Sequence, residues 1–234
     1  MKPKYNSLTL KLIAIITMTL DHIAIFFFKS NSPIYYSLRA VGRISFPIFA
    51  FLLTVGYFHT KNLKKYLGRL ISFALITEII YDYSFYNRFY YSKSQNIFFT
   101  LTLGLITIYL LDKTNKLIKN KISDAKDQKI ILLTINILII SLASFLSALL
   151  NLDYSIIGII MISTFYLFKN KYLIFITLLL TTLVFASNIQ PYSLISLYFI
   201  FNYQDQKMVN HKYFFYCYYP FHLLILKFLK TLIG

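Results

Sequence analysis

Cysteine, tryptophan and charged side chains are scarce in this chain. Cys217 is the single cysteine, so the chain cannot form a disulfide within itself, and tryptophan is absent. Charged residues make up 14% of the sequence, against about 25% in a typical soluble protein. Hydrophobic residues instead reach 58%, with a mean hydropathy of +0.63. This balance excludes a soluble globular domain and predicts an integral membrane protein.

The apolar residues gather into runs, several of them long enough to cross the ~30 Å hydrocarbon core of a bilayer. We expect an all-α, polytopic membrane helical bundle of about nine transmembrane helices, with about eight to ten as the range, forming a single domain over residues 1–234. Lysines precede the first run as in a signal peptide, but no small-residue cleavage site follows it, so we expect it to be retained. The runs are 8–28, 44–58, 67–81, 97–111, 130–150, 154–168, 171–187, 189–201 and 213–232.

Acidic residues are also few, with 8 Asp and Glu against 24 Lys and Arg, which gives a formal net charge of +16. If the N-terminus is cytoplasmic, most of the cations fall in cytoplasmic segments, as the positive-inside rule requires. We therefore attribute the basicity to topology and to anionic membrane lipid, not to nucleic acid. The expected location is the bacterial cytoplasmic membrane, as a multi-pass protein.

An aspartate and a histidine, Asp21 and His22, stand side by side inside the first apolar run. An ionisable group near the middle of a bilayer costs roughly 2.5 to 3.5 kcal/mol, so the pair either serves a function or only holds helices together. With the N-terminus inside, other polar residues reach the same level in the outer half of the membrane. Taken one at a time, several of them are accounted for as helix caps or as charges at the membrane interface. Their position at one level of the membrane indicates a functional site. They are Arg43, Glu78, Asp82, Asn96, Thr100, Asp153 and Tyr154.

A second polar cluster follows the run 44–58 and is rich in cations. Lysine and arginine at that end of the bundle suit an anionic ligand that bears phosphates, in a vestibule on the inner side. The alternative is ordinary positive-inside charge. The cluster comprises Tyr57, His59, Lys61, Lys64, Lys65 and Arg69.

A second candidate histidine, His222, lies in the last apolar run, two residues after Pro220. Proline has no backbone N–H and frees a helix carbonyl, which kinks the helix. We therefore expect His222 to point at a central cavity.

Two long motifs carry a resemblance to a known family. Residues 10–23 read LKLIAIITMTLDHI, and residues 42–60 read GRISFPIFAFLLTVGYFHT. Shorter blocks follow at 95–101, 153–158, 212–216 and 219–223. With these motifs the chain resembles the TraX family, membrane proteins named for the N-acetylation of F-type pilin. Where that family tends to read Glu-Ile-Pro-Phe-Asp, residues 78–82 read EIIYD, keeping both acids but losing the proline.

The resemblance implies a membrane-bound N-acetyltransferase, an acyltransferase-like domain that takes its acetyl group from cytosolic acetyl-CoA. The acceptor is an amine on the outer side, either the N-terminus of a processed pilin or that of another envelope peptide, or a glycan amine. No metal is expected. The acceptor site falls to Glu78, Asp82, Asn96, Thr100, Asp153 and Tyr154, and the donor site to the inner cluster together with Lys212.

The resemblance also implies roles for individual residues. His22 is either the general base or the nucleophile that carries the acetyl group, and His222 is the alternative base. Neighbouring residues on a helix point about 100° apart, so we expect Asp21 to pair with Arg43 and not to orient His22. Arg43 or Asn96 is expected to stabilise the oxyanion.

Two other function classes account for ionisable residues inside a membrane. A transporter or proton-coupled carrier uses such residues, although the matched broken helices typical of transporters are absent from this sequence. A membrane protease is less favoured still, because the sequence has neither a His-Glu-x-x-His motif for zinc nor a visible pair of aspartates. Acetyl transfer therefore stands as the preferred prediction, with transport as its alternative.

Overall fold

A computed structural model describes residues 4–185, 188–205 and 212–233, and all regular structure in this part of the chain is helical. This confirms the predicted all-α class. The elements are α1 (Ser7–Phe27), α2 (Pro33–Gly42), α3 (Ser45–His59), α4 (Leu63–Tyr86), α5 (Ile97–Lys121), α6 (Ala125–Leu149), α7 (Ser155–Leu167), α8 (Lys171–Phe185), the 3₁₀-helix η1 (Gln190–Ile195), α9 (Ser196–Phe201) and α10 (Lys212–Ile233).

Each predicted apolar run overlaps a helix, and the run 189–201 is divided between η1 and α9. The last two positions of the run 171–187 lie outside the described residues. Four segments of the described chain are long and apolar enough to cross a membrane, judged by length and composition: α1, α2 joined with α3 (Pro33–His59), α5 and α6. The helices α7 and α8 are apolar but shorter. The number of crossings and the side of the N-terminus stay predictions.

The structure adds α2, a helix that no apolar run predicts. Ser32 caps its N-terminus, because the Ser32 hydroxyl accepts a hydrogen bond from the backbone N–H of Tyr35 at 3.2 Å. Pro33 occupies the first turn, where its missing N–H is no loss. Polar and apolar residues alternate around this short helix, which hides it from a search for apolar runs. It ends just before α3 and brings a second arginine toward α1.

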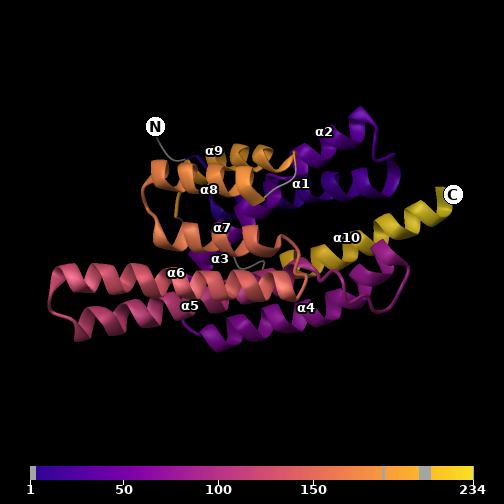
Figure 1. The fold of residues 1–234 in the computed structure, drawn as a ribbon. Coiled ribbons are helices and arrows are strands. Elements are labelled where there is room, and N and C mark those ends of the chain that lie inside the picture. The colour runs from indigo at the N-terminus through magenta and orange to yellow at the C-terminus, as the bar shows by residue number, and fades with distance from the viewer. Residues whose placement is uncertain (1–3, 186–187, 206–211, 234) are drawn as a thin grey trace.

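The helices pack so that the two ends of the sequence meet. The helices α5 and α6 form a long hairpin with α4 beside it (Figure 1). The first helix contacts α2, α3 and α10, and α4 contacts α5 and α10. Because α10 lies against both α1 and α4, residues some two hundred positions apart reach the same site.

The outer face of α6 is lined with large exposed hydrophobic side chains. Leu133, for example, is 62% exposed, and Leu142 and Phe145 are similarly open. Soluble monomers rarely expose contiguous apolar patches of this kind. This surface matches the lipid-facing side of a membrane helix.

Candidate functional site

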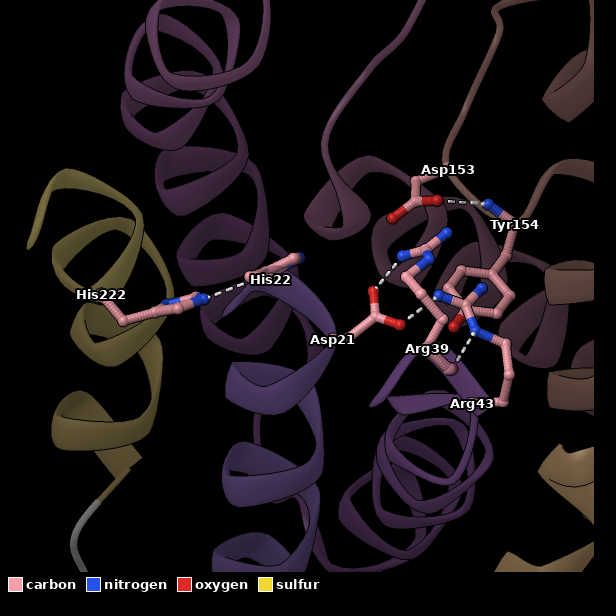
Figure 2. A network of polar contacts seen from close by, with 7 residues as sticks. All are labelled: Asp21, His22, Arg39, Arg43, Asp153, Tyr154 and His222. Carbon is pink, nitrogen blue, oxygen red and sulfur yellow. Dashed lines mark hydrogen bonds and ion pairs between the residues drawn. The ribbon is translucent and has the colours of Figure 1, made fainter. Parts of the chain in front are cut away.

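The carboxylate of Asp21 binds two arginines from the segment that follows α1. Arg43 Nη2 donates to Asp21 Oδ1 at 2.7 Å, which is the predicted pair, and Arg39 Nη1 donates to Asp21 Oδ2. Arg39 and Arg43 stand four residues apart, so they share one face of the chain as it leaves α2. The side chain of Asp21 is only 8% exposed, and Figure 2 shows both arginines turned toward it.

A second carboxyl group, Asp153, joins this cluster from the loop between α6 and α7. Its Oδ1 accepts a hydrogen bond from the backbone N–H of Tyr154 at 2.9 Å (Figure 2). Tyr154 adopts a left-handed backbone (φ 59°), and its ring stacks on Phe46 and lies 5.5 Å from the Arg43 guanidinium. Burial raises the pKa of Asp153 to about 6, although the charge of Arg43 acts in the opposite direction. The cluster therefore holds two carboxyl groups, of Asp21 and Asp153, and two guanidinium groups, of Arg39 and Arg43, whose charges nearly balance.

His22 meets α10 through one side of its ring. Its Nδ1 lies 2.6 Å from Nε2 of His222, and the two ring planes lie 16° from parallel with their centroids 4.9 Å apart (Figure 2). The second ring nitrogen of His222, Nδ1, lies 3.0 Å from the backbone carbonyl oxygen of Tyr218. Sequence reasoning placed His222 toward a central cavity, whereas in the structure it lies behind His22.

A cavity of about 570 Å³ runs beside these groups. Asp21, His22, Arg43 and Asp153 line one end, which we call the histidine end. Other polar residues line a second region, which we call the basic end: Lys11, His59, Thr60, Tyr66 and Arg69. Between them the walls are largely apolar and come from α1, α3, α4, α5 and α10.

The two ends are separated along the helix axes. Lys11 and Asp21 stand about ten residues apart on α1, or roughly 15 Å. On the antiparallel α3 side, Arg43 and His59 stand about sixteen residues apart, or roughly 24 Å. One elongated cavity therefore joins the cationic residues near the N-terminus of α1 to the histidine end.

The basic end holds a guanidinium group with spare hydrogen-bonding capacity. Arg69 lies 5.5 Å from the Tyr66 ring and bonds to Tyr216, while its buried Nε has no partner among the described residues. Lys11 lies 5.0 Å from the Phe215 ring. These donors suit an anionic group entering this end.

Other predicted acceptor residues stand behind the cavity wall. Asn96 is fully buried, and both its backbone N–H and its side-chain amide donate to Glu78 Oε2, at 2.9 and 2.6 Å. Asp82 accepts from the backbone N–H of Tyr91, and Thr100 donates to the carbonyl of Asp153. None of the four predicted residues Glu78, Asp82, Asn96 and Thr100 lines the cavity described here. Of the predicted acceptor set, Asp153 and Tyr154 do.

The predicted donor cluster divides in the same way. His59 and Arg69 line the cavity, and His59 Nε2 also meets both oxygens of Asp205. Tyr57 instead donates to Asp112 at 2.9 Å. The exposed side chains of Lys61, Lys64 and Lys65 lie away from the cavity wall, and the side chain of Lys212 is outside the part of the chain that the structure describes.

Sequence reasoning missed two cations of the site. Lys11 lies within the first apolar run, where a single charged side chain indicates a functional site. Arg39 lies between two predicted apolar runs, and its four-residue spacing from Arg43 is typical of residues that share one helical face.

Comparison with known proteins identifies the family. The model of the family described as TraX protein matches residues 7–230, which is most of the chain. The chain belongs to the TraX family. This TraX chain is also similar to the probable fimbrial assembly protein FimC, serogroup H1, of Dichelobacter nodosus, at 36% identity over 113 residues. That match covers 45% of the TraX chain and 46% of the relative, so it spans less than half of either. No solved structure matches this chain.

Proposed function

We propose that this protein is a membrane acetyltransferase that moves an acetyl group from acetyl-CoA to an amine, such as the N-terminus of a processed pilin or another envelope peptide. The observation that carries the proposal is the cavity that joins the basic end to His22. The family, and a relative named as a probable fimbrial assembly protein, favour a pilus-related acceptor.

The basic end fits the acyl donor. Coenzyme A bears phosphate groups, and Lys11 and Arg69 offer cationic donors there, with a free Nε on Arg69. A volume of about 570 Å³ lies within the range of roughly 300–1,000 Å³ that small-molecule sites have. The apolar walls between the two ends suit the uncharged arm that carries the thioester.

The charge pattern predicts a topology in which the two ends of the cavity face the compartments that the reaction needs. With a cytoplasmic N-terminus, Lys11 and the C-terminal end of α3 face the cytosol, where acetyl-CoA is made. Asp21 and His22 then lie past the midpoint of the bilayer, toward the outer side of the bacterial cytoplasmic membrane. A charged donor that cannot cross the bilayer and an external amine thus meet inside the bundle.

The histidine end supplies the groups that the transfer requires. The amine nitrogen forms a bond to the thioester carbonyl carbon, His22 removes the amine proton, and the carbon–sulfur bond breaks to release coenzyme A as its thiol. As an acyl carrier His22 would give the same products in two steps. Arg43 lines the cavity and is placed to stabilise the oxyanion, whereas the amide of Asn96 is taken up by Glu78. Asp153 offers a carboxylate to the acceptor ammonium group.

The test is release of free coenzyme A thiol by the purified protein in detergent, with acetyl-CoA and a peptide that has a free N-terminal amine. We expect the peptide to gain one acetyl group by mass spectrometry, and His22→Ala to lower the rate by about 10²- to 10⁴-fold. Arg69→Met should raise the KM for acetyl-CoA about tenfold and leave kcat nearly unchanged, since it removes a donor to the coenzyme. Leu138→Ala, on the exposed face of α6, is the matched control.

Thiol release that is equal in the wild type and in His22→Ala would contradict the proposal. Transport, the alternative function, moves its cargo without breaking the thioester. Uptake of labelled acetyl-CoA into vesicles with no free thiol and no acetylated peptide would therefore favour a carrier.

A further inference from the structure

The two histidines of the site form a hydrogen-bond chain whose direction is set at its far end. A backbone carbonyl only accepts, so His222 Nδ1, 3.0 Å from the Tyr218 oxygen, carries a proton and donates it. A neutral imidazole has one N–H, so Nε2 of His222 is unprotonated and accepts. Nδ1 of His22, 2.6 Å away, must then be the donor.

This order leaves one nitrogen of His22 free. Because Nδ1 carries the proton of the neutral ring, Nε2 keeps its lone pair. Nε2 lies on the side of the ring opposite His222, and the ring extends toward the Asp21 cluster (Figure 2). His22 lines the cavity, so its unprotonated nitrogen is the one available to a bound ligand.

Packing holds the chain of hydrogen bonds in place. The ring of His222 lies close to both His22 and Tyr218, with the Tyr218 centroid 5.2 Å away at an interplanar angle of 13°. The hydroxyl of Tyr218 and Oγ1 of Thr19 lie 2.7 Å apart and connect α10 to α1 beside these rings. Phe85 and Tyr219 close edge-on around His22. Both histidines are buried, His22 at 9% and His222 at 5% exposure.

We infer that His222 is a positioning residue that fixes His22 in the Nδ1–H tautomer, so that Nε2 of His22 is the atom that exchanges protons with the substrate. The inference rests on the proposed acetyl transfer. It assigns different roles to two histidines that the sequence alone could not distinguish.

The proton balance follows from this arrangement. As the amine nitrogen bonds to the acyl carbon, its proton passes to Nε2 of His22, and the resulting imidazolium still donates from Nδ1 to His222. When the carbon–sulfur bond breaks, the same proton passes from Nε2 to the leaving thiolate. The Tyr218 carbonyl cannot take a proton, so the chain ends there and no proton leaves the site by this route.

The first test is independent of catalysis. In the protein labelled with ¹⁵N-histidine, we expect both rings of the pair to be neutral and protonated at Nδ1, with a coupling across the hydrogen bond from His22 Nδ1 to His222 Nε2. Signals lost in His22→Gln and His222→Gln assign the rings. A proton on Nε2 of His22 in the resting protein would overturn the inference, whether or not the protein transfers acetyl groups.

The second test separates positioning from direct catalysis. A glutamine amide can place an accepting oxygen near the position of Nε2, so His222→Gln should keep activity within about tenfold of the wild type. His222→Leu removes the acceptor and should lose about 10²- to 10⁴-fold, as expected when a base is held in the wrong tautomer. Both variants should keep the wild-type KM for acetyl-CoA. Equal losses in two folded variants would mean that His222 itself exchanges the proton and would overturn the inference.

Discussion

Adjacent residues in α1 serve different partners. The side chain of Asp21 points to Arg39 and Arg43, and that of His22 points to His222. The divergence follows from the ~100° turn between neighbours on a helix, and the sequence is enough to predict it. The arginine at position 43 was predicted as well. Arg39 and the contact with His222 were not, because they depend on where α2 and α10 pack.

Close packing at Gly42 lets the Asp21 cluster form, and it predicts the effect of a single methyl group. A Cβ at position 42 would lie within 2.6 Å of Cγ of Asp21. Gly42→Ala should therefore lower the free energy of unfolding by about 1–3 kcal/mol, as overpacked sites do. The measurement is denaturant unfolding in a fixed detergent.

The control is Gly68→Ala in α4, where a Cβ would meet nothing within 4 Å. Replacing an exposed helical glycine should raise the free energy of unfolding by about 0.5–1 kcal/mol. Both variants add the same methyl group, and we expect it to change the free energy of unfolding in opposite directions. A stabilising Gly42→Ala would show that the contact with Asp21 is not tight.

At the scale of elements, the cap of α5 does more than end a helix. Asn96 Oδ1 accepts from the backbone N–H of Phe98 at 2.9 Å, and its amide also donates to Ala74 and Glu78 on α4. One buried side chain thus starts α5 and joins it to α4. The sequence indicates the cap, since Asn96 precedes an apolar run, but not the connection to α4.

We therefore expect Asn96→Ala to destabilise the protein by about 3 kcal/mol or more, because it removes the cap of α5 and the buried side-chain amide that donates to Ala74 and Glu78. Asn62→Ala is the matched change, since Asn62 caps α4 from an exposed position through the Lys65 N–H at 2.9 Å. That variant should cost only about 1 kcal/mol. Thermal unfolding of both in the same detergent measures the difference, and equal losses would mean that Asn96 is no more than a cap.

At the scale of the whole molecule, the cavity is assembled from segments across most of the sequence. Its wall includes Lys11 near the start of α1 and Tyr219 in α10. No local sequence pattern predicts that these two residues line the same cavity. The proposed function needs this continuity, because the donor and the acceptor enter from opposite ends.

A bulky side chain between the ends tests whether the cavity is used as a passage. Leu53, on α3, lines the cavity and is 4% exposed. Leu53→Trp should lower thiol release by about 10²-fold or more by separating the thioester from His22. Leu133→Trp adds the same ring on the lipid-facing side of α6, at 62% exposure, and should change the rate less than about twofold. Size-exclusion profiles must show that both variants are folded, and a folded, fully active Leu53→Trp would contradict a passage through this cavity.

The sequence by itself determined the helical class and the positions of the apolar helices, and it grouped Asp21, His22, Arg43 and Asp153, which line one cavity in the structure. Hydrophobic runs and isolated ionisable residues are local signals, and the bilayer makes them strong because burying charge in hydrocarbon is costly. Only the tertiary structure decided which of these groups face the cavity and which support it. It placed Glu78, Asp82, Asn96 and Thr100 behind the wall, and it brought His222 onto His22. Such contacts depend on how helices distant in sequence pack side by side, and residue spacing along one chain does not contain that information.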